Sequence, residues 1–516
     1  MKTKFVQVIG RGRWISLLIV IIFLFFTAKI YQNNALSFHF VDEEDNIVLG
    51  HYLLQGEKLY SDLFSHHQPL AYMMSGGVQQ VNETNTIFLL IKKHREAIII
   101  WACLWSILLV IRFGWPLLVF IGFFEILKFF LLGHLFLSES IVVYPFVYLI
   151  SWVSLKKNLY KGEIVFLGTC FVLSFFLLSP LWPVLIFLLL VVLYQTKYIL
   201  KNAILLLIGA FPILLLMLQV ITIKDYLYNA FFINFKYYIP IASQQNAHTT
   251  LFNAFLAPLI SLTMWQDRSA TLQIIQIFSF LFLVNSILLL MKKKINLIIL
   301  IFIILGLANL RYVIPGTQSY SGFHILPWFA GLLVLDLISL QFVWSNYSKA
   351  WIKFVTVFLL LGAFLITLKE VNQSLFPKKD INKDYYINYS RQADIGQAIK
   401  IMKEESETLF VVPDEWLIYW QADIKHFSRM VNYYAWMSTV PEIKEPLHIK
   451  FLQEPPTYFY CDRCDFGYYG LEAFFPLYSK VKKDGGETKL FVLKEKVKQI
   501  SKEQADNLQF YNFEVN

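Results

Sequence analysis

The chain has 516 residues, of which 57% are hydrophobic and only 16% are charged, and its mean hydropathy is +0.54. This balance excludes an ordinary soluble protein, which needs a charged exterior, and the 48 Phe, 28 Tyr and 13 Trp exclude disorder over most of the chain. The net charge of +9 does not indicate a nucleic-acid partner, because the basic residues fall between apolar stretches instead of along one face.

The composition therefore predicts a polytopic α-helical membrane protein with about eleven transmembrane helices in the plasma membrane, in contact with membrane lipids. The apolar stretches lie at about 14–31, 97–113, 115–133, 140–155, 164–179, 181–195, 202–221, 271–291, 295–310, 324–341 and 354–368. The first stretch follows Lys2, Lys4, Arg11 and Arg13 and lacks a small-x-small cleavage site, which indicates an uncleaved span and a cytoplasmic N-terminus. If each stretch crosses the membrane in turn from that side, most basic clusters fall on the cytoplasmic side. Residues 92–95 (Lys-Lys-His-Arg) are the exception and are expected outside, on an interfacial helix.

With loops on alternate sides of the membrane, the sequence predicts two parts: a transmembrane domain over residues 1–369 and a soluble extracytoplasmic α/β domain over residues 370–516. Residues 32–96 and 222–270 are the substantial outer loops of the first part. In the second part, residues 393–405 have the pattern of an amphipathic helix, and residues 408–412, 458–460 and 490–493 are typical of strands. Cys461 and Cys464 form an isolated C-x-x-C, for which a disulfide and a reduced pair are equally open.

Four carboxylates lie directly after the first span, at Asp42, Glu43, Glu44 and Asp45. One interpretation is purely structural: Asp42 caps a helix, and the next three acids complement the dipole of its first turn. The other interpretation gives these acids a functional role, and it rests on the residues that follow them.

The residues that follow resemble a known family. The acidic pair Asp42-Glu43, the pattern L-x-x-G-x-x-x-Y-x-D-x-F at residues 53–64 and H-x-P at residues 67–69 look like membrane glycosyltransferases of the GT-C type. That family includes protein O-mannosyltransferases, the lipid A aminoarabinose transferase and bacterial enzymes that use polyprenyl-phosphate sugars. Residues 137–140 (Leu-Ser-Glu-Ser), 311–330 and 410–413 (Phe-Val-Val-Pro) continue the resemblance along the chain.

The resemblance implies a polyprenyl-phosphate-linked sugar as donor and a hydroxyl on a glycan, a lipid or a protein as acceptor, in glycan biosynthesis at the cell envelope. It implies no nucleotide or soluble cofactor. The acceptor hydroxyl must lose its proton as the new bond forms, so a carboxylate acts as general base. Asp42 matches the family's aspartate and is the expected base, with Glu43 as the second choice.

Other candidate positions complete the expected donor-phosphate or acceptor site. They are Glu139, His66, His67, Arg311 and His324. Arg311 would hold the leaving phosphate with its fork of donors, and Asp42 with Glu139 would hold a divalent cation, Mg or Mn, if the enzyme uses one. Of the adjacent His66 and His67, at most one is expected to face the site. Structural alternatives stay open: an interfacial capping acid at Glu139, a snorkelling arginine at Arg311, and loop structure at the histidines.

Two alternative functions stay open as well. A polytopic transporter or flippase for lipid-linked sugars would use membrane-embedded charges, and Glu125 with Lys128 are such charges. Their spacing of three residues favours a structural pair on one helix face. The last alternative is an inactive homologue of the GT-C enzymes that acts as an assembly scaffold.

Overall fold

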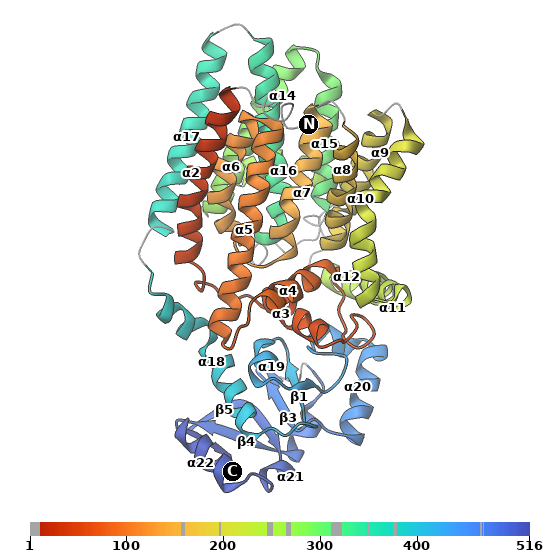
Figure 1. Cartoon of the computed structure of the whole chain (residues 1–516), viewed down its shortest axis with the longest axis vertical. Helices are drawn as coiled ribbons and strands as arrows, with labels where there is room; N and C mark the ends of the chain where they lie inside the picture. The colour runs from red at the N-terminus through yellow and green to blue at the C-terminus, as the bar shows by residue number, and fades with distance from the viewer. Residues whose placement is uncertain are drawn as a thin grey trace.

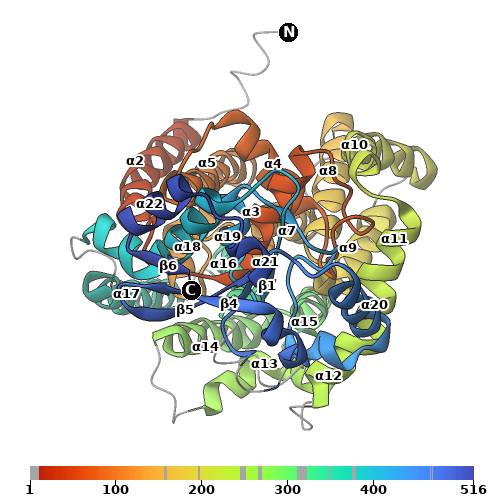
Figure 2. The ribbon, with the colours of Figure 1, turned by 90° about the horizontal axis from the view of Figure 1, so that it is seen from below.

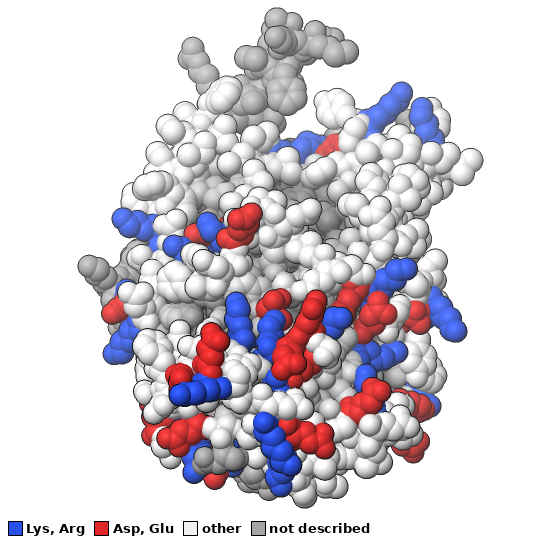
Figure 3. Space-filling model, turned by 60° about the horizontal axis from the view of Figure 1, so that its bottom comes forward, with Lys and Arg blue, Asp and Glu red and all other residues white. Residues whose placement is uncertain are grey.

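The computed structural model describes residues 11–155, 160–195, 198–244, 251–264, 270–310, 322–347, 350–374, 379–464, 467 and 469–515. A bundle of helices forms one end of the molecule and a small α/β part forms the other, with the short helices α3 (Val41–Leu54) and α4 (Leu70–Val81) between them (Figure 1). Charged side chains gather on the α/β end, and the bundle surface is mainly uncharged (Figure 3). A lipid-facing bundle with a water-facing cap has this distribution.

Each of the eleven apolar stretches forms a helix, and over their described residues six helices are long and apolar enough to cross a membrane. The six are α2 (Arg11–Asn33), α5 (Ile87–Phe113), α7 (Ser138–Leu155), α10 (Ile199–Val220), α14 (Ala270–Met291) and α16 (Leu326–Asn346). The others are α6 (Trp115–Leu127), α8 (Lys161–Leu177), α9 (Trp182–Gln195), α15 (Ile295–Ala308) and α17 (Ala350–Ser374). Of these, α6, α8, α9 and α15 have 13 to 17 residues, fewer than the ~20 that span a bilayer unaided.

Helices α7 and α16 form the centre of the bundle, because 89% of the residues in the most apolar part of each helix are buried. Helices α2 and α10 lie at the periphery, where only 28% and 17% of the corresponding residues are buried (Figure 2). The buried pair Glu125 and Lys128 lies at the end of α6, with Lys128 Nζ 2.7 Å from a Glu125 oxygen. The hydroxyls of Tyr31 and Tyr144 also donate to Glu125. The expected ion pair between these two side chains is therefore confirmed, and the tyrosines add to it.

The outer segment 222–270 is more structured than expected. It holds α11 (Ile223–Leu227), the π-helix η3 (Tyr228–Tyr238), α12 (Ile239–Gln244) and the apolar helix α13 (Leu251–Thr263). Helix α13 packs against α14 and α15, so this part of the predicted loop belongs to the bundle. Its sequence carries Asn253 and Pro258 among apolar residues, which shortens the apolar run below the length of a span.

The C-terminal part is built on a six-stranded mixed sheet with the order β2-β1-β3-β5-β4-β6. The strands are β1 (Thr408–Val412), β2 (Lys425–His426), β3 (Tyr458–Cys461), β4 (Tyr478–Lys483), β5 (Gly486–Leu493) and β6 (Phe513–Val515). The helices are α18 (Ile381–Met402), α19 (Leu417–Ala422), α20 (Pro441–Gln453), α21 (Lys494–Val497) and α22 (Lys502–Phe510). The three strands expected from the sequence are confirmed, whereas the helix expected at 393–405 is the second half of the longer helix α18. Cys461 and Cys464 form a disulfide.

The two parts share one apolar core. Tyr52 of α3 packs edge-on against Tyr419 of α19, and the Tyr52 hydroxyl donates to the backbone oxygen of Ile424 at 2.9 Å. Buried residues of α3, α4 and the start of α5 belong to the same cluster as buried residues of α18, α19 and the sheet. The first outer loop is thus held between the bundle and the sheet.

Candidate functional site

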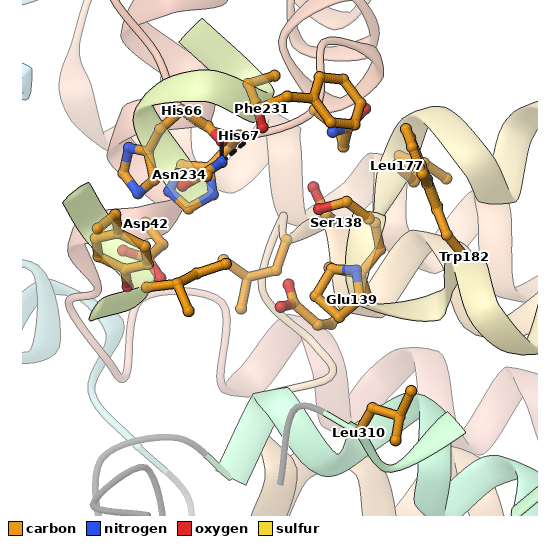
Figure 4. Close-up of a pocket in the computed structure, with 18 of the residues that line it drawn as sticks. Asp42, His66, His67, Ser138, Glu139, Leu177, Trp182, Phe231, Asn234 and Leu310 are labelled. Atoms are coloured by element: carbon orange, nitrogen blue, oxygen red, sulfur yellow. Dashed lines mark hydrogen bonds between the residues drawn. The ribbon is translucent and has the colours of Figure 1, made fainter. Parts of the chain in front are cut away.

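A cavity of about 530 Å³ lies beside α3 at the end of the bundle that faces the sheet. Its walls come from α3, the loop 66–68, the first turn of α7, the segment from the end of α8 to the start of α9, and η3 (Figure 4). These segments are far apart in the sequence, and each places polar or aromatic side chains toward the same space.

Asp42 and Asp45 line the cavity from one face of α3, because residues three apart lie on the same side of a helix. The residue that precedes the helix is Phe40, whose side chain makes no capping bond, so the expectation that Asp42 caps the helix is wrong. The Asn46 amide joins α3 to the segment before α7, because it donates to the Asp42 backbone oxygen at 2.9 Å and to the Phe136 backbone oxygen at 3.1 Å.

Glu43 lies outside the residues that line the cavity. Its carboxylate is buried and accepts hydrogen bonds from Arg95 Nε at 3.0 Å and from an Arg95 terminal nitrogen at 2.6 Å. The Phe136 backbone N–H also donates to it at 2.8 Å. Glu43 is therefore the acid of a structural ion pair, and its carboxylate does not reach the cavity. Arg95 is likewise buried in α5, although the sequence placed it on an interfacial helix.

Asp45 is a buried acid whose surroundings favour the protonated form. Burial is the main cause that raises its pKa from 3.8 to about 8, and the nearby charge of Asp42 adds to this; a hydrogen bond from the Tyr72 hydroxyl works in the opposite direction. The Tyr72 hydroxyl lies 2.7 Å from the Ser65 hydroxyl, which continues the chain of hydrogen bonds into the outer loop. The two carboxyls that face the cavity therefore differ in environment. Sequence reasoning counted Asp45 only as a charge at the helix start.

His66 and His67 both line the cavity, so the expectation that at most one of them faces it is wrong. Their rings lie with centroids 4.0 Å apart, and the His66 ring also contacts Tyr238 of η3 at 4.7 Å. The Asn234 amide donates to the His66 backbone oxygen at 2.6 Å, which joins η3 to the loop (Figure 4).

Glu139 faces the same cavity from the first turn of α7. It lies 3.3 Å from Nδ1 of His324, which belongs to the short helix η5 (Gly322–Ile325), so these two predicted residues are brought together. Arg311 lies outside the described residues, directly after Leu310, which lines the cavity. Asp42, His66, His67 and Glu139 thus share one site, with His324 behind Glu139.

Most of the other residues that line the cavity are apolar, and those of α8, α9 and η3 were not identified from the sequence. They include Leu177, Trp182, Ile186, Phe231 and Phe235. Ile186 and Phe235 are 49% and 68% exposed, so the apolar wall continues onto the outer surface of the bundle. The aromatic-rich run of residues 226–238 was the available signal, and most of it forms the π-helix η3, a form that often marks functional sites.

The described lining of the cavity contains three acids, two histidines and no lysine or arginine. This donor set can accept a proton from a hydroxyl. The opposite, apolar wall suits a hydrocarbon chain. In comparisons with family models, with curated proteins and with solved structures, none matched this chain.

Proposed function

We propose that this chain is a GT-C type membrane glycosyltransferase that transfers a sugar from a polyprenyl-phosphate donor to an acceptor hydroxyl. The observation that carries the proposal is the single cavity lined by Asp42, His66, His67 and Glu139, which come from three separate segments. A polar end next to an apolar wall that reaches the bundle surface fits a substrate with a charged phosphate and a long hydrocarbon tail.

In the proposed reaction, the acceptor oxygen attacks the anomeric carbon and the carbon–oxygen bond to the phosphate breaks. The polyprenyl phosphate leaves with the bonding electrons, and the acceptor proton passes to the Asp42 carboxylate. Asp42 lies in the first turn of α3, where the helix dipole favours the ionised form that a base requires. If the enzyme uses a divalent cation, Mg²⁺ or Mn²⁺, Asp42 and Glu139 would hold it, and it would neutralise charge on the leaving phosphate.

The topology in this proposal has an N-terminus in the cytoplasm and the sheet outside the cell membrane, with all eleven apolar helices inside the bilayer. The shorter helices would cross at the margins of the ~30 Å hydrocarbon layer or within a locally thinned bilayer. The cavity then lies at the outer membrane surface, where a lipid-linked donor can enter sideways.

The test is a transfer assay with the purified chain in lipid vesicles and a panel of polyprenyl-phosphate sugars. An enzyme releases polyprenyl phosphate only when an acceptor glycan, lipid or protein is added. A flippase would move labelled donor between the leaflets and release none, and a scaffold would do neither. Either of these outcomes across the panel contradicts the proposal.

A further inference from the structure

A second cluster of possible ligands lies outside the cavity, where the membrane part meets the sheet. His39 precedes α3, Glu44 lies in the first turn of α3, and Glu415 lies between β1 and α19. One ligand atom from each of these three residues lies within 4.8 Å of the other two. Glu44 is 1% exposed and Glu415 is 4% exposed, so two carboxylates are buried side by side.

Neither oxygen of the buried Glu44 carboxylate has a hydrogen-bond partner, although Nε2 of His39 lies against one of them. An unsatisfied buried carboxylate is costly, because it has lost its hydration without gaining donors. A second polar atom at the cluster, Oε1 of the buried Gln392 of α18, also lacks a partner. These two observations are independent of the proximity of the acids.

The protons available at the cluster cannot satisfy all of its contacts. Nε2 of His39 lies 3.0 Å from the Gln392 amide nitrogen, which only donates, so Nε2 must present its lone pair there. The same atom would have to carry a proton in order to bond Glu44. Turning the Gln392 amide around would place its oxygen where the nitrogen now lies, 2.5 Å from an oxygen of Glu415, and two acceptors repel each other.

A cation removes this conflict, because every one of these groups can then present a lone pair to it. We propose that His39 Nε2, a Glu44 oxygen and a Glu415 oxygen bind a structural zinc ion, with the Gln392 amide oxygen or a water as fourth ligand. An imidazole with carboxylates suits zinc better than magnesium, which prefers oxygen ligands and retains its waters. Arg391 donates to Glu415 and holds it in place, as outer residues of zinc sites commonly do.

The zinc would fasten the first turn of α3, which carries Asp42, to the loop that follows β1. Two of the ligands come from the membrane part and one comes from the C-terminal part, so the ion bridges the junction between them. This site does not depend on the proposed glycosyl transfer, and it is separate from the Asp42–Glu139 cavity.

Metal content tests the proposal. The full-length chain in detergent, kept under non-reducing conditions, is stripped with chelator, reloaded with Zn²⁺, desalted and analysed by mass spectrometry of the metal. The wild type is expected to hold about one zinc per chain more than either ligand variant, His39→Ala or Glu415→Gln. The matched control is His426→Ala at the same junction, where His426 already bonds Glu57 at 2.6 Å and the Ser428 backbone oxygen at 2.7 Å. It should hold as much zinc as the wild type.

Thermal unfolding gives a second readout that needs no variant to fold well. Chelation is expected to lower the melting temperature of the zinc-loaded wild type and of His426→Ala, because bound metal stabilises only the folded state. Equal zinc contents in the wild type and in both ligand variants would overturn the proposal. So would a wild-type melting temperature that chelator leaves unchanged, which is the result for a plain His39–Glu44 ion pair.

Discussion

Asp42 and Glu43 are neighbours in the chain, yet the turn of α3 directs their side chains to different sides of the helix. Asp42 faces the cavity, and Glu43 faces Arg95. The sequence predicted that this acidic pair matters, from its position after the first span. It could not separate the two roles, because the partner of Glu43 lies 52 residues further along the chain.

The Glu43–Arg95 pair should prove structural. Both side chains are at most 2% exposed, so Glu43→Ala leaves a buried arginine without its counter-charge and is expected to lower the free energy of unfolding by about 3–5 kcal/mol. Thermal and denaturant unfolding in detergent measure this loss. The control is Glu96→Ala, which removes the partly exposed Lys93–Glu96 pair and should cost less than about 1 kcal/mol. Equal effects of the two substitutions would contradict the structural role.

Asp45 should make stability depend on pH. Its folded pKa of about 8 lies above the ordinary 3.8, so between these values the unfolded chain releases a proton that the folded chain keeps. This contribution to stability therefore falls as the pH rises from about 4 to about 8, by about 1.4 kcal/mol for each pH unit, and is constant above that range. Asp45→Asn cannot titrate, so its stability relative to the wild type should rise over that window. If the difference in melting temperature between the wild type and Asp45→Asn were the same at every pH from 5 to 9, the raised pKa would be contradicted.

At the scale of elements, the π-helix η3 shows what a sequence pattern could not predict. The run of residues 226–238 is rich in aromatics without a clear helical or strand period, and it was expected only as part of an outer loop. In the structure the Asn234 amide bonds both the Ala230 backbone oxygen of η3 and the His66 backbone oxygen of the distant loop. Such a shape depends on contacts between segments, which local propensity does not contain.

Two glycines allow helices α8 and α10 to pack backbone to backbone. A Cβ added to Gly209 would lie 1.8 Å from the Val165 backbone oxygen, and one added to Gly168 would lie 2.0 Å from that of Leu206. Gly209→Ala should therefore separate the helices and lower the free energy of unfolding by about 1–3 kcal/mol. The matched control is Gly122→Ala in α6, where a Cβ meets nothing within 4 Å and the better helix former should be neutral or slightly stabilising. Unfolding curves that rank the two variants the other way would refute this packing.

At the scale of the whole molecule, the sequence located most of the apolar helices and the principal strands but not how they combine. Hydropathy identified eleven of the apolar helices, because composition alone marks them, but it missed α13 and overestimated how many are long enough to span a membrane. The strands at 408–412 and 458–461 were predictable from their β-branched and aromatic residues. The shared core between the outer loop and the sheet was not, because it joins residues more than 300 positions apart.

That shared core predicts that the C-terminal part is needed for the folding of the first outer loop. A chain that ends at residue 378 would expose the buried face of Tyr52, which packs against Tyr419 and His426 in the cluster common to both parts. We expect such a chain to aggregate or to melt at a clearly lower temperature than the full chain in the same detergent. Unchanged melting and monodispersity on size-exclusion chromatography would show that the two parts fold independently.

The central claim is that Asp42 is the base of a lipid-linked glycosyl transfer, and acceptor-dependent release of polyprenyl phosphate measures it most directly. Asp42→Asn keeps the size of the side chain and removes the proton acceptor, so turnover should fall at least ~100-fold while donor binding persists. Glu83→Gln, an exposed acid in the same outer segment, should turn over like the wild type. Near-normal turnover by Asp42→Asn, once wild-type transfer is established, would contradict the account.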